Sequence, residues 1–440
     1  MTPDHPIVVI GAGPIGLAAA AELLDRGRDP IVLEAGPHAG AAVREWSHVR
    51  LFSTWSELVS PAAARLLEPT GWQRPDGAAY PLGGEWASEY LDPLAAVLGD
   101  RIRFDTRVTG VARRGRDRVV DSGRNDQPLT VHAVDATGAS GRTTAHAVID
   151  ASGTWATPNP LGGDGYPAIG EPDARQRVSY RIPDLREPGI RARYAGKRVA
   201  VLGSGHSALT ALVELAALAD SDGTHVIWLL RRGEIGNTFG GGEADQLPAR
   251  GALGRRAQAA VQNGHVDVVT GFRTQALEKG SGERLVLTGE DGRRLPEVDE
   301  IVGLTGFRPD LSFLSEVRLD LDSRLQAPVQ LAPLIDPNIH SCGTVYPHGV
   351  NELSHPEPGV YLVGMKSYGR APTFLAMTGY EQVRSVAAAI AGDSESAERV
   401  ELALPESGVC GGAGLFDEAD ATTGGCCAPT TVEISSSRPA

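Results

Sequence analysis

One stretch near the N-terminus constrains the fold more than any other feature of the sequence. Over residues 6–35, the apolar run PIVVI leads into the turn GAGPIG, the helix-like segment LAAAAELLDRG and a second apolar run, PIVLEAG. A strand, a tight glycine turn, a helix and a second strand in this order are typical of a unit with two parallel strands. The sequence therefore predicts an α/β fold organised around a parallel sheet.

The glycines of the first turn predict a dinucleotide-binding site. Gly11 permits the tight turn, Gly13 lets the backbone approach a pyrophosphate, and Gly16 lets the helix pack on the strand. Glu34 ends the second strand, where a carboxylate accepts hydrogen bonds from an adenosine ribose. Such glycines also occur in ordinary turns, but here the strand, turn, helix and terminal acid agree. The residues expected to contact the first dinucleotide are Gly11, Gly13, Pro14, Ile15, Gly16 and Glu34.

A second unit of the same kind follows at residues 196–233, where KRVAVL, GSGHSA, LTALVELAALA and THVIWLLRRG read as strand, turn, helix and strand. Its second strand ends in Arg231 and Arg232 instead of an acid. Guanidinium groups at this place suit the 2′-phosphate of NADPH, although they also fit a solvated basic strand end. The residues expected to contact NADPH are Gly203, Gly205, His206, Ser207, Ala208, Arg231 and Arg232.

The length and charge of the chain limit its domain count and its partners. A chain of 440 residues is too long for one typical core and predicts two or three domains. The formal net charge of −14 argues against nucleic acid or an anionic membrane as the main partner. The N-terminal residues MTPDHP lack the basic segment of a signal peptide, and none of the four cysteines belongs to a CxxC pair. We therefore expect a cytoplasmic protein with reduced thiols.

Four stretches together resemble the flavoproteins with two dinucleotide-binding domains, and among these most closely the flavin-containing monooxygenases. They are GAGPIGL with Glu34, VIDASGTWATPNP, GSGHSA and LTGFRPD. The resemblance implies two Rossmann-like domains in a three-layer β/β/α arrangement, with FAD in the first site and NADPH in the second. It places a discontinuous FAD domain at 1–160 and 304–400, an NADPH domain at 161–303 and a cysteine-containing tail at 401–440, whose composition predicts disorder.

The sequence departs from the pattern of these flavoproteins in three places. It lacks the FxGxxxHxxxW or FxGxxxHxxxF fingerprint of well-studied monooxygenases before the second glycine turn, and it lacks the CxxC pair of the related disulfide reductases. The reductases also carry an aspartate that meets FAD where this chain has Met365. At that strand end, the backbone or Lys366 remains to contact the cofactor, or the contact is absent.

A narrower resemblance is to flavin-dependent monooxygenases encoded alongside arsenic-resistance genes. It rests on EWSHVRLFSTW, GGGEADQLPARGALG, HSCGTVYPHG, GMKSYGRAPTFL and the cysteine-bearing tail. It implies an oxidation linked to arsenic, with arsenite or an organoarsenical as the substrate.

Two segments supply further candidates for the cofactor site. The resemblance places a helix that starts near Pro372 with its N-terminus at the flavin, where backbone donors stabilise the anionic reduced ring. The alternative is an ordinary core helix with nothing at its end. The chain after Glu34 also runs along the flavin in this superfamily. The additional residues expected to contact cofactor are Trp46, Gly153, Gly306, Gly364, Thr373 and Phe374.

The candidates for substrate chemistry are less tightly specified. Trp46, His48, Arg50 and Phe52 alternate, which fits either one face of a half-buried strand or an active-site wall where His48 and Arg50 bind an oxyanion. Cys342 lies between two histidines in HSCGTVYPHG, where a thiol is either reactive or buried and inert. The catalytic candidates are Lys366, Cys342, His48 and Arg50.

Three of the four cysteines lie in the tail. Cys410, Cys426 and Cys427 are either incidental thiols or three soft ligands that together capture trivalent arsenic. In the second interpretation, the tail collects arsenite or an organoarsenical and delivers it to the flavin.

These features together predict an FAD-dependent, NADPH-consuming monooxygenase that oxidises a soft nucleophile with oxygen. One alternative is an NADPH-dependent flavin reductase that works through Cys342 or the tail thiols. Another is a non-catalytic flavoprotein that binds metalloids. Two-domain flavoproteins often pair as homodimers, but no helix pattern in the sequence requires it.

Overall fold

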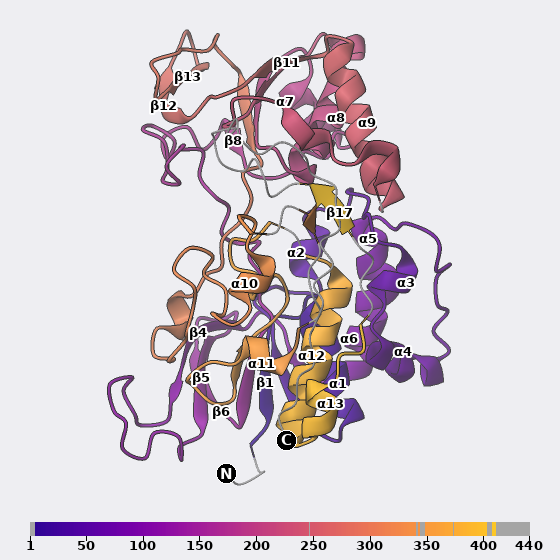
Figure 1. The fold of residues 1–440 in the computed structure, drawn as a ribbon, viewed down its shortest axis with the longest axis vertical. Helices are drawn as coiled ribbons and strands as arrows, with labels where there is room; N and C mark the ends of the chain where they lie inside the picture. The colour runs from indigo at the N-terminus through magenta and orange to yellow at the C-terminus, as the bar shows by residue number, and fades with distance from the viewer. Residues whose placement is uncertain are drawn as a thin grey trace, which may run out of the picture.

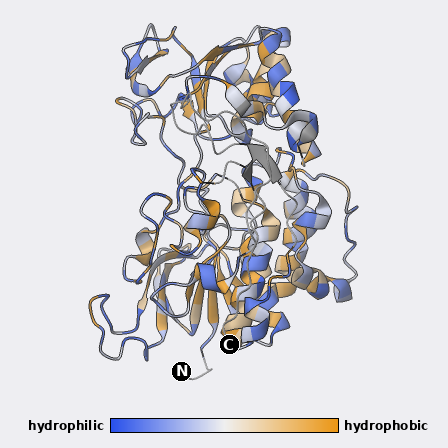
Figure 2. Cartoon of the chain, viewed as in Figure 1, coloured by the Kyte–Doolittle hydropathy of each residue, from blue (hydrophilic) through white to orange (hydrophobic). Residues whose placement is uncertain are grey.

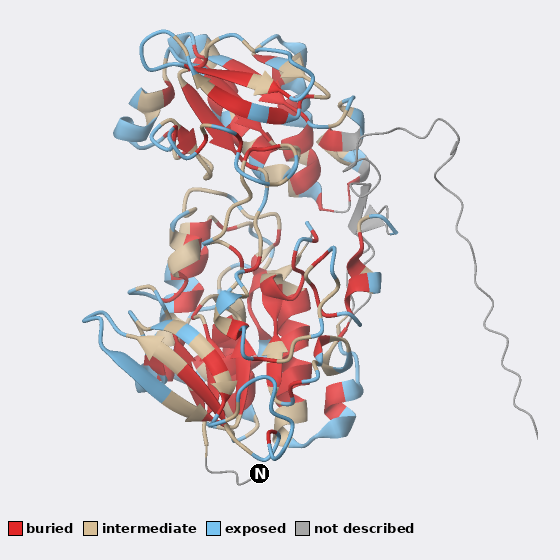
Figure 3. Ribbon diagram, turned by 90° about the vertical axis from the view of Figure 1, so that its left-hand side faces the viewer, coloured by how far each residue is buried: buried red, intermediate tan, exposed pale blue. Residues whose placement is uncertain are grey.

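The computed structural model describes residues 5–245, 247–339, 342–343, 348–372, 374–402 and 407–410. The chain forms two sheet-based units, one above the other in Figure 1, and two of the described segments pass between them. Buried strands form the centre of each unit, and exposed residues gather on the outer loops (Figure 3). Among the described helices, none has the length and apolar character needed to cross a membrane.

The lower unit is built on a five-stranded sheet in which all neighbouring strands are parallel. Its strands, in spatial order, are β16 (Val360–Leu362), β7 (Ala147–Asp150), β1 (Ile7–Ile10), β2 (Pro30–Leu33) and β3 (Ile102–Arg103).

Side chains alternate across this sheet and fill two separate cores. Ile7 and Val9 pack into a core that contains helices α1 (Pro14–Asp25) and α12 (Ala376–Ala391). Val8 and Ile10 instead pack toward an antiparallel three-stranded meander. The period of two in a strand explains this division, and the central strands β1 and β2 are correspondingly apolar on both faces (Figure 2). The unit therefore has the expected β/β/α layers. The meander comprises β4 (Arg107–Arg113), β5 (Leu129–Val134) and β6 (Ser140–Ala145).

Most of the chain between β2 and β3 is helical and completes the helical side of the lower unit. Two of these helices begin with a proline in the first turn, where its missing N–H costs nothing. The helices are α2 (Ala41–Arg44), α3 (Trp55–Leu58), α4 (Pro61–Leu67), α5 (Gly83–Trp86) and α6 (Asp92–Leu98).

The upper unit repeats the same plan. Val199 and Val201 of its central strand face the helical core, whereas Ala200 and Leu202 face the core beneath a β-hairpin. The parallel sheet has the order β11 (Val266–Val269), β10 (His225–Leu229), β9 (Arg198–Leu202), β14 (Glu300–Gly303) and β8 (Val178–Ser179). The helices are α7 (Pro188–Tyr194), α8 (His206–Asp222) and α9 (Pro248–Gln262), and the hairpin is β12 (Thr274–Lys279) with β13 (Leu285–Gly289).

Two crossing segments join the units. Pro158 and Phe307 form an isolated antiparallel bridge, and the amide of Asn159 donates to the carbonyl of Gly306 over 2.9 Å. Trp155 stacks on Phe307 with ring centroids 4.9 Å apart, and the guanidinium of Arg181 lies 3.9 Å from the Trp155 ring. The strands of the two sheets fit the expected division at 160/161 and 303/304, although the exact domain boundaries remain predictions.

The remaining elements correct one expectation and add a short strand pair near the C-terminus. The long helix expected near Pro372 begins instead at Ala376, because Leu375 is extended (φ −111°, ψ 144°) and serves as its N-cap. The tail expected to be disordered lies largely outside the described residues, but Ser407–Cys410 forms strand β17, which pairs with β15 (Cys342–Gly343). The other short elements are α10 (Ala332–Ile335), α11 (Val350–Leu353), α13 (Ser394–Glu398), η1 (Glu68–Thr70), η2 (Ala87–Leu91), η3 (Gly99–Arg101), η4 (Gly236–Phe239), η5 (Gly242–Ala244), η6 (Ser312–Leu314) and η7 (Gly364–Lys366).

A buried ionic triad fastens the meander to the edge strand of the lower sheet. Glu357, three residues before β16, accepts from Arg113 and Arg124, each over 2.6 Å. All three side chains are at most 1% exposed. Burial alone would raise the pKa of Glu357, but hydrogen bonds from the two arginines outweigh it and hold the pKa below its ordinary value.

We expect Glu357→Gln to lower the free energy of unfolding by about 3–5 kcal/mol, because it leaves two buried guanidinium groups without a counter-charge. Chemical unfolding at neutral pH measures the loss. Since the folded pKa is depressed, the contribution is present above roughly pH 4.3 and is lost as the pH falls through the folded pKa. The exposed Glu316→Gln is the control, and an equal effect of the two substitutions would contradict the role of the triad.

Candidate cofactor and active site

The first glycine turn connects β1 to α1 and leaves open space at the N-terminus of α1, where the pyrophosphate of a dinucleotide would bind. A Cβ at Gly16 would lie 1.9 Å from the carbonyl oxygen of Gly11, so glycine is required for the helix to pack on the strand. A Cβ at Gly13 would meet nothing within 4 Å. Gly13 is the N-cap of α1, and no side chain caps it, so amide donors of the first turn remain for an anion. The turn therefore fits the pyrophosphate of FAD.

Glu34 lies at the mouth of this turn. Its carboxylate accepts from the amide of Ala12 over 2.6 Å and from the amide of Gly36 over 2.7 Å. Each carboxylate oxygen has a second acceptor direction, so the same group remains able to receive the hydroxyls of a ribose. Glu34 is thus a structural brace of the turn as well as the expected ribose acceptor, and the sequence indicated only the second role.

Two further turns flank the first glycine turn. The turn after β7 packs against Gly11, since a Cβ at Gly11 would lie 3.1 Å from the Cα of Ser152. The turn after β16 packs against the start of α1, since a Cβ at Gly364 would lie 3.2 Å from the side chain of Ile15. Both turns contain a glycine in the left-handed region, Gly153 at φ +67° and Gly364 at φ +68°.

Lys366 does not fit a catalytic role. Its side chain is 0% exposed, and Nζ lies 2.8 Å from Oδ2 of Asp150 and 2.9 Å from Oγ of Ser152. An ammonium enclosed in this way cannot touch a substrate. The expectation of a catalytic Lys366 is therefore corrected, and its partner Asp150 showed in the sequence only as an acid at a strand end.

A second buried network holds the turn after β16 from the side of α12. The side-chain oxygen of Gln382 accepts from the amide of Gly364 over 2.7 Å, and its nitrogen donates to Ser367 over 2.9 Å. The same nitrogen lies 2.8 Å from Nε2 of His348. His348 packs beside Tyr368, whose ring meets Phe374 edge-on at 5.0 Å. Phe374 thus lies in the segment before α12 and not within its first turn, and Thr373 lies outside the described residues.

The second glycine turn, between β9 and α8, repeats the geometry of the first. Gly203 has φ +131°, and a Cβ there would lie 2.2 Å from the carbonyl oxygen of Leu304, whereas a Cβ at Gly205 would meet nothing within 4 Å. No side chain caps the N-terminus of α8 at Gly205. Within α8, Ser207 is exposed and Ala208 is buried. Arg231 is exposed just beyond β10, which keeps it accessible to a 2′-phosphate.

The segment 45–52 of the lower unit contacts the upper unit at three places. Phe52 meets the ring of His206, the first residue of α8, with centroids 5.3 Å apart. His48 Nδ1 lies 3.9 Å from Asp184, and Glu45 lies 3.4 Å from Arg181. Burial, with a smaller contribution from the charge of Arg250, lowers the pKa of His206 to about 4, so the imidazole is neutral at pH 7. Phe52 therefore stands beside the turn that would hold the pyrophosphate of NADPH.

The other residues expected in this segment lie apart from one another. Residues 45–49 form turns and not a strand, so the alternation seen in the sequence does not mark a strand face. Trp46 packs against Gly83 and Trp86, and Arg50 is exposed and donates to the carbonyl of Tyr80. Burial lowers the pKa of His48, and the carboxylate of Asp184 opposes this shift.

The remaining residues expected at the site lie in the crossing segments or toward the C-terminus. Gly306, at φ +90°, belongs to the crossing segments. Cys342 and Cys410 are opposite each other in the register of β15 and β17. Cys426 and Cys427 lie outside the described residues. Within the described part of the chain, no three His, Cys, Asp or Glu side chains gather as a metal site.

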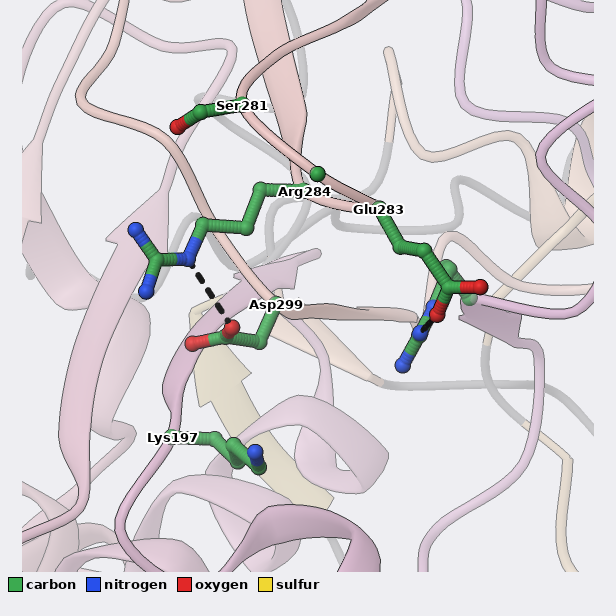
Figure 4. A pocket seen from close by; sticks show the side chains of 7 residues that line it. Lys197, Ser281, Glu283, Arg284 and Asp299 are labelled. Atoms are coloured by element: carbon green, nitrogen blue, oxygen red, sulfur yellow. Dashed lines mark hydrogen bonds and ion pairs between the residues drawn. The ribbon is translucent and has the colours of Figure 1, made fainter.

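A cavity of about 460 Å³ in the upper unit is not the nucleotide site (Figure 4). It lies beside the starts of β9 and β14, whereas ligands bind at the carboxyl ends of parallel strands. Its charged groups are largely paired, with Arg284 Nε 3.3 Å from Asp299 and Arg177 bound to Glu283. The lining residues are Arg177, Lys197, Ser281, Gly282, Glu283, Arg284 and Asp299.

Two substitutions separate packing from cofactor binding at the first turn. Gly13→Ala should leave the unfolding midpoint without added FAD unchanged, because φ is −76° and the space is open, but it should weaken FAD binding at least about tenfold. Gly16→Ala should prevent stable folding, because of the close approach to Gly11. Flavin fluorescence titration and thermal unfolding measure the two effects. Normal FAD affinity of Gly13→Ala would contradict the assignment.

Arg231→Ser should raise the KM for NADPH about tenfold and leave the KM for NADH nearly unchanged, because a charge-assisted contact to the 2′-phosphate is lost. Steady-state kinetics with both nucleotides measures this. Arg255→Ser, at an exposed position on α9, is the control for loss of surface charge. Parallel changes in both KM values would count against a phosphate contact.

Comparison with known proteins agrees with this geometry. The sequence profile described as pyridine nucleotide-disulphide oxidoreductase matches residues 8–333. Among solved structures, bacillithiol disulfide reductase Bdr from Bacillus cereus has a TM-score of 0.64 and 20% identity, over 88% of this chain and 99% of that one. The FAD-bound cadaverine monooxygenase DfoA from Erwinia amylovora has a TM-score of 0.61 and 16% identity, over 91% and 98%. A flavin-containing monooxygenase from Stenotrophomonas maltophilia has a TM-score of 0.55 and 22% identity, over 88% and 98%.

At these identities the structural matches establish the fold, and the profile establishes the family. The profile covers most of the chain, including both glycine turns. The protein therefore belongs to the pyridine nucleotide-disulphide oxidoreductase family and is an oxidoreductase whose cofactors are FAD and a nicotinamide nucleotide.

Proposed function

We propose that this protein is an FAD-dependent monooxygenase that consumes NADPH and oxygenates a soft nucleophile. The observation that carries the proposal is the position of the cysteines. The family profile matches residues 8–333, and the first cysteine of the chain is Cys342. The matched span therefore holds no cysteine and lacks the CxxC pair that the related disulfide reductases carry, which counts against a reductase of that type. Oxygen is then the most direct acceptor for electrons that arrive from NADPH.

The proposed reaction balances with the two cofactors and oxygen. NADPH gives two electrons as hydride, one oxygen atom is added to the lone pair of the substrate, and the other oxygen atom leaves as water with two protons. Bound FAD supplies the redox chemistry of hydride acceptance and oxygen reduction. No dedicated acid or base is needed at the substrate, since a soft nucleophile such as trivalent arsenic, sulfur or nitrogen attacks with its own lone pair.

The residues of the chain bind and enclose the reactants. The open faces of Gly13 and Gly205 receive the two pyrophosphates, and Arg231 favours NADPH over NADH. The neutral ring of His206, against Phe52, keeps an apolar wall beside the nucleotide turn.

Arsenite or an organoarsenical is the substrate we favour. The support is the resemblance of several long segments to monooxygenases encoded with arsenic-resistance genes, together with three cysteines among residues 401–440. Thiolates of Cys410, Cys426 and Cys427 suit a thiophilic ion, and the tail would gather the substrate for oxidation. The resulting product would be a pentavalent arsenic species.

The test combines an oxygen electrode with the absorbance of NADPH and quantification of arsenate. We expect arsenite to accelerate NADPH oxidation, with one oxygen molecule consumed and one arsenate formed per NADPH. A thioether in place of arsenite shows whether the site accepts soft nucleophiles in general. NADPH oxidation that releases only hydrogen peroxide, with neither substrate oxidised, would overturn the monooxygenase proposal.

A second candidate function is reduction of a disulfide. It is favoured by the opposite placement of Cys342 and Cys410 in the antiparallel pair β15–β17, because directly opposed residues have Cα separations compatible with a disulfide. NADPH would then reduce the disulfide to two thiols without oxygen. Under anaerobic conditions this activity requires both cysteines, so Cys342→Ser and Cys410→Ser would each abolish it. A third candidate, metalloid binding without catalysis, predicts that arsenite binding survives loss of FAD in Glu34→Ala.

A further inference from the structure

The buried ion pair of Lys366 and Asp150 occupies a position that its chemistry alone does not explain. Both side chains are 0% exposed, and Nζ lies 2.8 Å from Oδ2 of Asp150. Removing two charges from water costs free energy that their attraction repays only in part, so an apolar pair of similar size would be about as stable. The pair is therefore better explained by what it positions than by stability.

The ion pair lies at the carboxyl edge of the lower sheet, where ligands of this fold class bind. Asp150 is the last residue of β7, and Lys366 is the last residue of η7, just after β16. The two strands are neighbours, with Leu362 paired to Asp150. The pair thus joins the two turns that flank the first glycine turn, one against Gly11 and the other against Ile15.

Lys366 acts through Ser152 and not on a ligand directly. The ammonium donates to Oγ of Ser152 over 2.9 Å, pairs with Oδ2 of Asp150 over 2.8 Å and lies 4.3 Å from the ring of Phe313, so the contacts of its charge lie inside the protein. Oδ1 of Asp150 accepts from both the amide of Ser152 over 3.0 Å and its hydroxyl over 2.6 Å. Ser152 itself is exposed and lies beside Gly11. The buried charges therefore fix an exposed turn at the cofactor site.

We propose that Lys366 is a positioning residue for FAD. Together with Asp150, it holds the turn after β7 and the turn after β16 at a fixed separation on either side of the glycine turn. Gln382 anchors the second of these turns from α12, so that turn is held from two directions. The consequence is a preformed cofactor cradle that loses affinity when the link through Ser152 is cut. This role depends on FAD binding and not on which substrate is oxidised, so it stands or falls separately from the proposed function.

The test uses the holoenzyme and measures FAD itself. Ser152→Ala removes only the hydroxyl to which Lys366 donates and keeps both buried charges, and the unfolding midpoint without FAD shows whether the variant folds normally. Asp150→Asn with Lys366→Met removes both charges and keeps an acceptor for Ser152. For each variant, the rate of FAD release is followed by flavin fluorescence after dilution, and the unfolding midpoint is measured with and without excess FAD.

We expect both variants to release FAD about tenfold faster than the parent protein and to gain less thermal stability from added FAD. The matched control is Asp245→Asn with Arg250→Met, which removes a buried aspartate–cation pair (2.6 Å) in the upper unit. This control should leave FAD release unchanged, whatever it does to the unfolding midpoint.

Two results would overturn the proposal. One is a normal rate of FAD release in both Ser152→Ala and the double variant. The other is a double variant whose unfolding midpoints with and without FAD fall equally, because the pair would then serve stability alone.

Discussion

The lower unit can hold its cofactor turn only because no side chain separates α1 from the strand that precedes it. Gly16 approaches the carbonyl of Gly11 so closely that a single methyl group would not fit. That approach directs the N-terminus of α1 at the open face of Gly13, and it brings Ala12 within reach of the Glu34 carboxylate. The flanking turns then close on the same point from β7 and β16. Helix packing, turn geometry and cofactor recognition are therefore consequences of one contact.

The upper unit builds its turn on a different close contact, because a Cβ at Gly203 would lie 2.2 Å from the carbonyl oxygen of Leu304 and the helix carries Ala208 where the lower unit has Gly16. The crossing segments connect the two units that carry these turns. Each crossing segment binds the other through backbone hydrogen bonds near Asn159 and Gly306, and Arg181 covers the stacked rings of Trp155 and Phe307. A cation held over two aromatic rings makes a junction that resists separation but offers few directional restraints. The side-chain contacts of Glu45, His48 and Phe52 with the upper unit add directional restraints on how the two units are oriented.

Local sequence predicted what local geometry controls. Both glycine turns and the strand–turn–helix–strand units around them follow from short patterns, because each depends on residues close together in the chain. The β/β/α layering was implied by the family resemblance instead, since it brings the meander at 107–145 against β1 and β16. Lys366 could not be assigned in this way, since its contact with Ser152 joins residues 214 positions apart and its burial is decided by tertiary packing. The start of α12 was misplaced for a different reason. A proline suits a first helical turn, but the extended backbone of Leu375 delays the helix to Ala376. The segment 45–52 alternated like a strand, yet its role lies in contacts with residues more than a hundred positions away.

The contact of Phe52 with His206 has a consequence for how such proteins diversify. The nucleotide turn belongs to the upper unit, but part of its wall is supplied by the lower one. The two units are therefore not independent modules, even though each has its own sheet and its own cores. If the upper unit were exchanged for that of another family member, its surface would no longer match Phe52, His48 and Glu45 of the lower unit. Recombination of these units must therefore preserve or replace residues 45–52 together with the turn that they cover.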